Sequence, residues 1–295
     1  MLSKKQFDIL VCFSENLLGI SKRNISKEIK LSIGSVYKNI RILNREGFVY
    51  KNKITEKGLN KLEEYRVKRI IITAAGFGAR MLPLTLNSPK ALIRVYGTRL
   101  IDTLLDAVYQ AEIEEVYIVR GYLSEQFDQL LIKYPNIKFI DNKNYIEENS
   151  ISSIIAAGNL IDNTYITDSD LYISNPKVIT KYQYNSNYIG YFVDKTDDWC
   201  VKLKNGFISS MSIGGEHCYQ ILGISYWSRV DSKKLMKHIE RVYNSLGGKQ
   251  TVWDLVPLSI NIKDFKISVR ECDKSDLIEI DTYNELKEID KAYEI

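Results

Sequence analysis

The stretch RIIITAAGFGARMLPLTLNSPKALIRV, residues 69–95, decides how the rest of the chain can be interpreted. Ile70 to Thr73 is a short apolar, β-branched run of the kind that forms a strand buried on both faces of a sheet. The glycines and alanines that follow leave room for backbone N–H groups to close around phosphate oxygens. This loop consists of Ala74, Ala75, Gly76, Phe77 and Gly78. A strand followed by such a loop predicts a phosphate-binding turn.

Two cations follow the glycines, as a bound polyphosphate would require. Arg80 ends the loop, and Lys90 comes directly after Pro89. Because proline fixes its own backbone and restricts its neighbour, Lys90 is expected on a turn and outside a regular helix. Neither GxxxxGKS/T nor GxGxxG occurs in the chain, so a P-loop or a dinucleotide-binding turn is disfavoured.

The complete order of strand, AAGxGxR, PxT and PKAL resembles the signature of the nucleotidyltransferases that make nucleoside-diphosphate sugars and alcohols. The resemblance implies an α/β fold, a Rossmann-like, GT-A-like and mostly parallel sheet with the nucleotide across its C-terminal edge. Helical and strand patterns also alternate through residues 100–141, which predicts a parallel sheet covered on both faces. We therefore expect a nucleotidyltransferase domain at residues 67–295.

Charge divides the chain into two parts. Its 295 residues have a net charge of +4, but residues 1–69 hold 16 Lys and Arg against 7 Asp and Glu, and the remainder holds 25 against 30. Opposite charges suggest two domains with different partners. Three helical patterns, a basic hairpin around Lys51 and Lys53, and a last helix capped by Thr55 resemble a winged helix-turn-helix domain at residues 1–66.

The third of these helices, from Ser32 to Leu43, has the position of a DNA-recognition helix. The side chains expected on its exposed face and on the hairpin are Ser32, Ser35, Tyr37, Lys38, Arg41, Lys51 and Lys53. In DNA-binding winged helices this helix lies in the major groove and the wing contacts phosphate. The excess of positive charge favours DNA as a partner. A docking or dimerisation module with solvated lysines is the alternative, and a dimer is compatible with the sequence.

Composition narrows the remaining classes of protein. No run approaches the ~20 apolar residues of a membrane span, and Met1 to Gln6 lacks the apolar core of a signal peptide. We expect a cytoplasmic protein without a membrane partner. The four cysteines form no CxxC pair, and the two histidines have no partner at metal-ligand spacing. A zinc site and a Ser–His–Asp triad are therefore disfavoured.

Two segments carry the predicted metal ligands. YITDSDLY, residues 165–172, is a strand that delivers Asp168 and Asp170 to the same side. Carboxylates so close repel unless a cation lies near them. In the family that the glycine loop resembles, an aspartate at this strand end holds Mg²⁺, and Asp170 matches it better than Asp168. LIEIDT, residues 277–282, resembles the family's closing element and makes Asp281 the second ligand. A strand-end cap is the alternative for each aspartate alone.

Three further residues are candidates for nucleotide binding. The segment NSISSIIAAG, residues 149–158, enters a helix and resembles the family segment beside the nucleotide, with Asn149 and Ser152 as the better-placed side chains. A helix N-cap built from Asn149 or Ser150 is an equal alternative. Tyr122 lies in the segment GYLSEQFD, which the resemblance also covers.

The three tryptophans, Trp199, Trp227 and Trp253, all lie between the two predicted metal ligands. Aromatic faces beside carboxylates suit a quaternary ammonium, because this weakly hydrated cation interacts with the ring quadrupole. We predict a substrate site from Trp199 and Trp253, which lie in turn-like contexts beside Asp198 and Asp254. Trp227, on an apolar strand, is expected in the core.

From residue 69 onward, these segments together resemble the CTP:phosphocholine cytidylyltransferases. The N-terminal 66 residues are unusual for that family, and the small residues next to Asn149 differ from its familiar versions. The resemblance implies Mg²⁺-dependent attack of a phosphocholine oxygen on the α-phosphorus of CTP. A phosphate nucleophile needs no general base, since its second pKa is about 6. Arg80 would hold the β- and γ-phosphates, and Lys90 the α-phosphate.

Two alternatives remain open at this point. The same chemistry could act on phosphoethanolamine, 2-aminoethylphosphonate or a sugar 1-phosphate. The chain could also be a nucleotide-sensing transcription regulator, although a sensor would not need Arg80, Lys90, Asp170 and Asp281 together.

Overall fold

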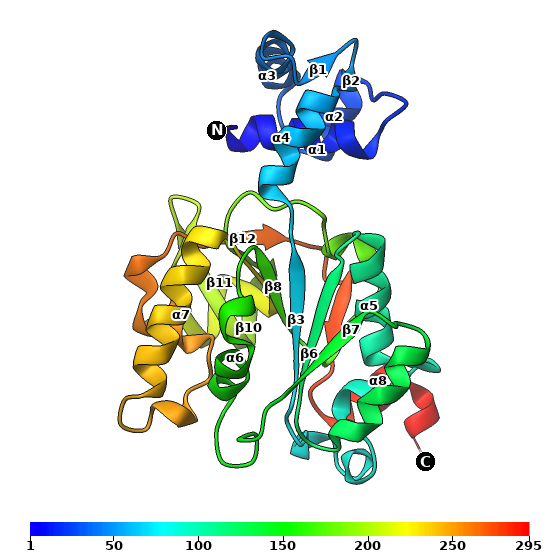
Figure 1. The fold of residues 1–295 in the computed structure, drawn as a ribbon, viewed down its shortest axis with the longest axis vertical. Helices are drawn as coiled ribbons and strands as arrows, with labels where there is room; N and C mark the ends of the chain where they lie inside the picture. The colour runs from blue at the N-terminus through cyan, green and yellow to red at the C-terminus, as the bar shows by residue number, and fades with distance from the viewer. Residues whose placement is uncertain (295) are drawn as a thin grey trace. The chain divides into compact units, whose positions relative to one another are not determined.

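The apolar run after Arg69 is an interior strand of a seven-stranded sheet. In the computed structural model, which describes residues 1–294, the strand order is β12-β10-β11-β8-β3-β6-β7 (Figure 1). Its strands are β3 (Arg69–Ala74), β6 (Glu115–Arg120), β7 (Ile137–Asp141), β8 (Thr164–Asp168), β10 (Asn187–Lys204), β11 (Phe207–Trp227) and β12 (Ser268–Glu271). The smaller sheets of this part of the chain pair β4 (Arg94–Val95) with β5 (Thr98–Arg99) and β9 (Leu171–Ile173) with β13 (Leu277–Glu279).

The sheet is mostly parallel, as the sequence predicts. Strand β3 runs parallel to both β6 and β8, β6 runs parallel to β7, and β10 runs parallel to β12. Strand β11 is the exception, because it is antiparallel to β8 and to β10. The C-terminal ends of β3, β6, β7 and β8 therefore meet at one edge, where the glycine loop begins.

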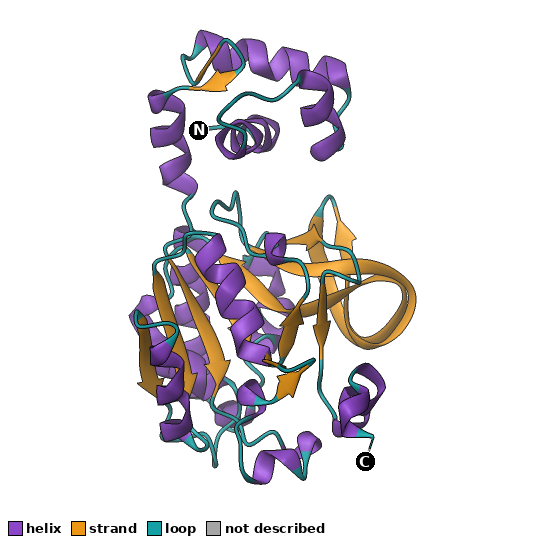
Figure 2. Ribbon diagram, turned by 90° about the vertical axis from the view of Figure 1, so that its right-hand side faces the viewer, coloured by secondary structure: helices purple, strands orange, loops and turns teal. Residues whose placement is uncertain are grey.

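The hairpin of β10 and β11 is the largest irregular feature of the sheet. Figure 2 shows paired strands that curl strongly as they leave the sheet. The register shifts repeatedly, for example between Thr196 and Trp199, and each bulge adds twist and bends the strands. The segment that contains Asp198 and Trp199 is thus part of a strand, and the turn-like context expected for Trp199 is wrong.

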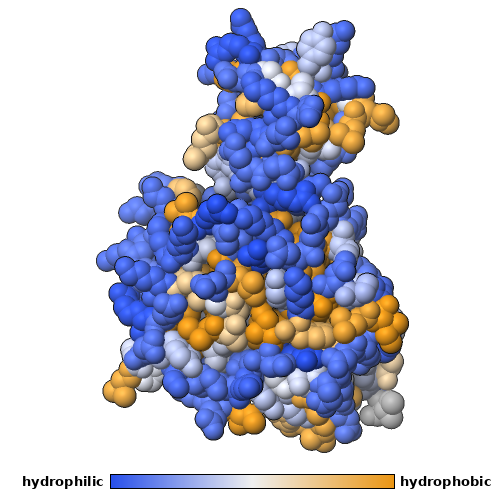
Figure 3. All heavy atoms as spheres, viewed as in Figure 1, coloured by the Kyte–Doolittle hydropathy of each residue, from blue (hydrophilic) through white to orange (hydrophobic). Residues whose placement is uncertain are grey.

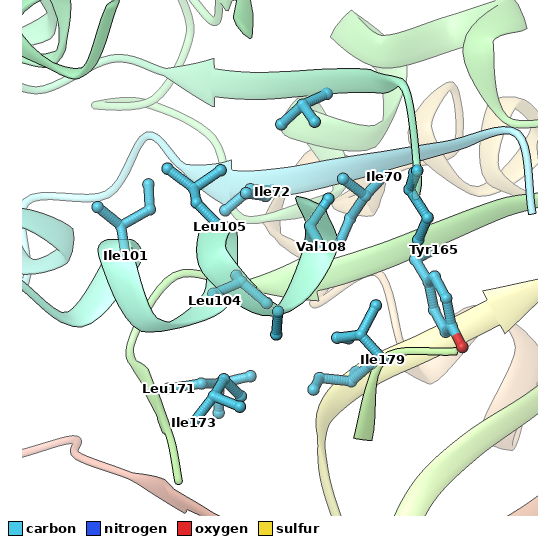
Figure 4. Close-up of a cluster of buried hydrophobic side chains, with 14 of the residues drawn as sticks. Ile70, Ile72, Ile101, Leu104, Leu105, Val108, Tyr165, Leu171, Ile173 and Ile179 are labelled. Carbon is cyan, nitrogen blue, oxygen red and sulfur yellow. The ribbon is translucent and has the colours of Figure 1, made fainter. Parts of the chain in front are cut away.

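Helices cover the sheet on both faces. Helix α5 (Leu100–Gln110) packs its apolar stripe on the side chains of Ile70 and Ile72 (Figure 4). Helices α6 (Ile151–Ala157) and α7 (Arg229–Tyr243) belong to the second cluster, which contains Ile71. Since successive strand residues point to opposite faces, the two clusters lie on either side of β3. The remaining helix of this unit is α8 (Tyr283–Ile289).

The chain divides into two units, Met1–Arg66 with Tyr182–Tyr184, and Val67–Lys181 with Asn185–Ile295. We call them unit 1 and unit 2. Unit 1 contains helices around a small hairpin, namely α1 (Lys4–Glu15), α2 (Lys22–Glu28), α3 (Ile33–Arg45), β1 (Val49–Tyr50), β2 (Lys53–Ile54) and α4 (Glu56–Leu62). Its core is formed by apolar side chains of α1, α2, α3 and α4, including Phe13, Ile25, Leu43 and Leu62. The predicted cap of α4 is present, since Thr55 accepts from the backbone N–H of Gly58. Ser32 caps α3 in the same way, by accepting from the backbone N–H of Ser35.

One predicted helix differs in kind. The pattern of apolar residues over 124–133 predicts an amphipathic helix, but Ser124–Ile132 forms 3₁₀ turns. The segment starts from Leu123 in a left-handed conformation, with φ of 46°, and buries only Phe127 and Leu130. Few apolar contacts give little support to the longer α-helical hydrogen-bond ladder.

Among the described residues, no helix is long and apolar enough to cross a membrane.

Candidate active site

The glycine loop leaves the C-terminal end of β3 and turns back on itself at Gly78. Gly78 has φ of 70°, in the left-handed region that favours glycine. A Cβ there would lie 3.2 Å from Lys90 Cβ and 3.2 Å from Thr85 Cγ2. Gly76 instead faces open space, with nothing within 4 Å of an added Cβ. Thus Gly78 fits the loop onto the Lys90 segment, and Gly76 leaves backbone accessible to a ligand.

Aromatic residues hold this loop in position. The ring of Phe77 meets the ring of Tyr122 edge-on, with centroids 4.7 Å apart. The Tyr122 hydroxyl donates to the Thr85 carbonyl at 2.8 Å, and its backbone N–H donates to the Ala75 carbonyl at 3.0 Å. Both polar groups of Tyr122 therefore serve the loop, which makes it a positioning residue in this structure. Ala74 and Ala75 are buried.

The two predicted cations converge on carboxylates. Lys90 Nζ lies 2.7 Å from Asp170 Oδ2 and 3.0 Å from Asp281 Oδ1. Arg80 makes a two-pronged contact with Asp281, at 2.8 and 3.1 Å. Burial by itself lowers the pKa of Lys90, but Asp170 and Asp281 outweigh it and the pKa is raised. Lys90 is a fixed positive charge beside the glycine loop.

Three carboxylates gather next to this pair. One oxygen each from Asp168, Asp170 and Glu279 lies within 4.8 Å of the other two. Pairing of β9 with β13 brings Glu279 opposite Leu171, directly beside Asp170. Burial, and then the neighbouring carboxylates, raise the pKa of Asp168 and of Glu279 well above the usual range. Such a cluster attracts a cation strongly.

One oxygen of this cluster lacks a partner. Asp170 Oδ1 is buried and, within residues 1–294, accepts no hydrogen bond. Asp168 is fixed by a hydrogen bond from Thr73 Oγ1 at 2.8 Å. An added Cβ on Gly223 would lie 2.6 Å from Asp168 Oδ2. The Asp168 carboxylate therefore packs directly against the backbone of Gly223. Oxygen ligands with an orphaned atom fit a hard divalent cation such as Mg²⁺.

The structure differs from the sequence-based ligand set at one position. Asp170 lies in the three-carboxylate group as expected, whereas Asp281 contacts Lys90 and Arg80. Glu279, two residues earlier on the same segment, lies in the three-carboxylate group, and the ligand role of Asp281 stays a prediction. Alternation along β13 was the available signal, because Glu279 and Asp281 lie on the same side of an extended chain.

A cavity of about 340 Å³ opens beside the loop on the β7 side. Four of its lining residues were predicted from the sequence, namely Ala75, Gly76, Asn149 and Ser152. Sequence reasoning missed three others, Asn142, Tyr145 and Gln250. Ser152 Oγ donates to the Asn149 carbonyl at 2.8 Å and accepts from Asn142 Nδ2 at 2.9 Å. Asn142 follows β7 directly, and the strand-end rule that selected the aspartates also applies to it.

A second cavity of about 340 Å³ lies between the β10–β11 hairpin and the carboxylates. Its charged lining consists of Asp198, Glu279, Asp281, Glu285, Glu288 and Lys274. Gln220 Nε2 donates to Asp198 Oδ2 at 2.9 Å, and Thr196 fixes the Gln220 amide by donating to its oxygen at 2.9 Å. Burial, followed by Asp281 and Glu285, raises the pKa of Asp198. Five carboxyl groups against one lysine make this lining acidic, which suits a cationic group.

The predicted tryptophan box is only partly accessible. Trp253 is 3% exposed and packs edge-on against Trp227, with ring centroids 6.2 Å apart. Trp199 is half-buried and packs against the same apolar cluster. Asp254 accepts a hydrogen bond from the Tyr188 hydroxyl at 2.7 Å, and burial raises its pKa to about 7. Trp227 is a core residue, as expected, whereas Trp253 and Asp254 take part in internal packing.

The assembled site combines accessible loop amides, two cations, three clustered carboxylates and two cavities on opposite sides. Its positive groups can hold a polyphosphate, and its carboxylates can hold a divalent cation. No histidine lies among these residues, so the arrangement favours positioning and charge neutralisation over proton abstraction by a side chain.

Known proteins agree with this geometry. The nucleotidyl transferase family matches residues 69–198. The chain is 37% identical to a 2-aminoethylphosphonate cytidylyltransferase of Lancefieldella rimae over 76% of this chain and 92% of that one. It is 30% identical to the choline-phosphate cytidylyltransferase of Streptococcus pneumoniae over 75% and 97%.

A solved structure is similar over the same extent. The CTP:phosphocholine cytidylyltransferase from Streptococcus pneumoniae superposes with a TM-score of 0.70 at 29% identity, covering 77% of this chain and 99% of that one. A putative glucose-1-phosphate thymidylyltransferase from Bacillus anthracis has a TM-score of 0.62 at 15% identity, and this likeness shows the fold alone. The chain belongs to the nucleotidyltransferase family of enzymes, among its cytidylyltransferases.

Proposed function

We propose that the chain transfers a cytidylyl group from CTP to a small phosphonate or phosphate that carries an ammonium group. The observation that carries this proposal is the acidic cavity beside the Asp168–Asp170–Glu279 cluster, opposite the nucleotide-side cavity. Pyrophosphate release from CTP with a panel of acceptors tests it directly. No turnover with any ammonium-bearing acceptor, under conditions where a sugar 1-phosphate reacts, would contradict it.

In the proposed reaction, an acceptor oxygen forms a bond to the α-phosphorus of CTP while the bond to the β-phosphate oxygen breaks. The products are a CDP-linked acceptor and pyrophosphate. The acceptor oxygen is already deprotonated near neutral pH, so no side chain needs to take a proton. Loop amides from Gly76 to Gly78 and the Arg80 guanidinium bind the β- and γ-phosphates. Lys90 shifts from Asp170 and Asp281 toward the α-phosphate, where negative charge builds up.

The carboxylate group fits a magnesium ion as the cofactor. Asp170, with its unpartnered oxygen, together with Asp168 and Glu279 would hold the ion. When bound, Mg²⁺ supplies charge neutralisation and orientation for the phosphate oxygens. Asp281 then anchors Lys90 and Arg80 in the free enzyme. The prediction that Asp281 is itself a ligand remains to be tested.

The lining of the acidic cavity favours a primary ammonium. A primary ammonium donates hydrogen bonds, and the cavity lining includes Asp198 and Tyr191, whose side chains carry oxygen atoms that can accept them. A trimethylammonium donates none and depends on aromatic faces, but Trp253 is buried. We therefore rank 2-aminoethylphosphonate first and phosphocholine second. The Tyr191 ring on the cavity wall is the observation that supports phosphocholine.

Acceptor preference gives a sharp prediction, because phosphoethanolamine and phosphocholine differ only in three methyl groups. We expect kcat/KM to favour the primary ammonium by about tenfold, the equivalent of about 1.4 kcal/mol or one charge-assisted hydrogen bond. Asp198→Asn should lower kcat/KM for phosphoethanolamine and 2-aminoethylphosphonate and leave the KM for CTP unchanged. Pyrophosphate release measures both. A wild-type preference for phosphocholine that is lost in Trp199→Leu would contradict this prediction. It would instead support an aromatic site for trimethylammonium that includes Trp199.

Alanine substitutions at Gly223 and Gly76 test two different roles, the packing around Asp168 and the access of phosphate to the loop. Gly223→Ala should reduce the free energy of unfolding by about 1–3 kcal/mol, because its Cβ would overlap Asp168 at 2.6 Å. Gly76→Ala meets nothing within 4 Å and should leave stability unchanged, yet weaken CTP binding by placing a Cβ toward the phosphates. Thermal unfolding and CTP titration separate the two effects. If Gly76→Ala binds CTP with unaltered affinity, the loop at Gly76 does not contact the phosphates.

For residues 1–66 we propose a winged helix-turn-helix architecture. The order α1-α2-α3-β1-β2-α4 supports it, with α3 as the recognition helix and the β1–β2 hairpin as the wing.

A further inference from the structure

The nucleotide-side cavity contains a polar network whose hydrogen bonds have fixed directions. Asn142 directly follows β7, and its Nδ2 lies 2.9 Å from Ser152 Oγ and 3.1 Å from Ser153 Oγ. All three residues line the cavity, and each is at most 5% exposed. Buried polar groups are normally all paired, so the donor and the acceptor of each bond can be worked out in turn.

The direction of the network is set at Asn142. The backbone N–H of Asn144, which can only donate, lies 3.0 Å from Asn142 Oδ1. The amide oxygen therefore faces Asn144, and the amide nitrogen faces the two serines. An amide nitrogen carries two hydrogens and accepts none. Both serine hydroxyls are consequently acceptors in their bonds with Asn142.

This arrangement leaves Ser153 with a proton that no protein group takes. Each serine hydroxyl has one proton of its own to donate. Ser152 donates its proton to the Asn149 carbonyl at 2.8 Å. Within residues 1–294, Ser153 Oγ accepts from Asn142 and donates to no protein acceptor. Because Ser153 is 5% exposed and lines the cavity, its proton is available to a ligand that enters there.

The other lining residues suit a nucleobase. Tyr145 lines the cavity and packs against Gly121, where an added Cβ would lie 2.7 Å from the Tyr145 ring. Nucleobases stack readily on aromatic side chains. Gly76, on the phosphate loop, borders the same cavity. Figure 3 shows apolar and hydrophilic residues interspersed over the visible face of unit 2. Surface hydropathy therefore does not mark this site, and the buried network is the more specific signal.

From these observations we propose that Ser153 selects cytosine by donating a hydrogen bond to N3 of the base, and that Asn142 is the positioning residue that fixes its direction. Cytosine N3 is an acceptor, whereas uracil N3 carries a hydrogen. A serine free to rotate could donate to one base or accept from the other. The bond from Asn142 removes this freedom, because a uracil N3–H would leave the Ser153 proton without an acceptor.

N3 is the position where a fixed donor favours CTP over UTP. The O2 atom is an acceptor in both bases, so a donor there would not distinguish them. At position 4 a donor would favour uracil, whose O4 accepts, over the amino group of cytosine. Base selection by Ser153 rests on the proposed function, because it requires CTP as the nucleotide that enters this cavity.

The test measures binding of α,β-methylene CTP and α,β-methylene UTP to the full chain by calorimetry, with Mg²⁺ and without acceptor. The wild type should bind the CTP analogue about 10–100-fold more tightly, the effect of one unpaired buried donor. Ser153→Ala should reduce this ratio by about tenfold, because alanine offers no donor to either base.

Asn142→Asp should reverse the direction of the network. A carboxylate oxygen accepts only, so Ser153 would donate to it and present lone pairs to the base. The ratio of the two affinities should then fall below that of Ser153→Ala and approach or pass unity in favour of UTP. The added negative charge weakens both analogues alike and leaves the ratio unaffected, which separates base selection from a general loss of binding.

The matched control is Ser232→Ala, which removes a buried helical hydroxyl outside this cavity. Ser232 lies on α7, is 1% exposed and donates to the Trp227 carbonyl at 3.3 Å. Its substitution should keep the wild-type ratio. Thermal unfolding shows which variants are folded, and Ser153→Ala decides alone if Asn142→Asp is not.

The outcomes separate this proposal from the proposed function. A wild-type preference for CTP that Ser153→Ala retains, or a loss of affinity that is equal for both analogues, would overturn the assignment of Ser153 to N3 and leave the cytidylyl transfer standing. An unchanged ratio in folded Asn142→Asp would show that Asn142 does not fix the direction of Ser153. If the wild type binds neither analogue, or binds the UTP analogue more tightly, CTP is not the donor and both proposals fail.

Discussion

Lys90→Ala is expected to reduce kcat by about 10²–10³-fold, the usual effect of removing one preorganised charge at a transition state. Lys90 Nζ lies 2.7 Å from Asp170 and 3.0 Å from Asp281 in a position that is only 13% exposed. No other described cation bridges these two carboxylates. The loss should appear in single-turnover measurements with saturating CTP, because the chemical step itself slows.

The control for this variant is Lys237→Ala, which removes an exposed cation on α7. It should keep kcat within a factor of about two, as surface substitutions usually do. Removal of Lys90 leaves carboxylates without their counter-charge, so thermal unfolding must accompany the kinetics. If Lys90→Ala is folded and turns over at the wild-type rate, Lys90 has no part in the reaction. The positive charge that stabilises the transition state must then come from Arg80.

Local sequence patterns predicted the parallel half of the sheet well. The run Ile70 to Thr73 forms a strand as expected, and β6 and β7 lie within residues 100–141, where strand patterns alternate with helical ones, because each is a short apolar segment bounded by polar turns. The β10–β11 hairpin could not be predicted in the same way. Its bulges interrupt the two-residue alternation, and burial along β10 follows the curl of the hairpin instead of a fixed period.

The candidate site was predictable where function depends on local backbone. The glycine loop, Arg80 and Lys90 are close in sequence, and their geometry follows from one strand–loop–turn segment. Glu279 is different, because long-range strand pairing brings it into place. Glu279 reaches Asp170 only through the pairing of β9 with β13. Likewise, Trp253 was expected in the substrate site, but its contact with Trp227 depends on tertiary packing that no local pattern encodes.

The identity of the second metal ligand can now be decided by experiment. The sequence predicts Asp170 with Asp281, whereas the structure brings Asp170 together with Glu279 and Asp168. We expect Asp170→Asn and Glu279→Gln each to weaken Mn²⁺ binding by at least about 10–100-fold, since even outer-shell partners of metal ligands have effects of this size. Asp281→Asn should change Mn²⁺ affinity by less than about threefold and lower kcat instead, because Arg80 and Lys90 lose their shared anchor.

Mn²⁺ affinity is measured by electron paramagnetic resonance of the free ion, with α,β-methylene CTP present so that no reaction occurs. This signal reports metal binding without turnover, and it therefore separates loss of the ion from loss of Lys90 alignment. Glu288→Gln is the matched control, since Glu288 also lines the acidic cavity but has no oxygen in the three-carboxylate group. Equal loss of Mn²⁺ binding in Asp281→Asn and Asp170→Asn, with Glu279→Gln unaffected, would return the site to the pair predicted from sequence. The reverse pattern would show that β9–β13 pairing, which no local motif encodes, completes the metal site.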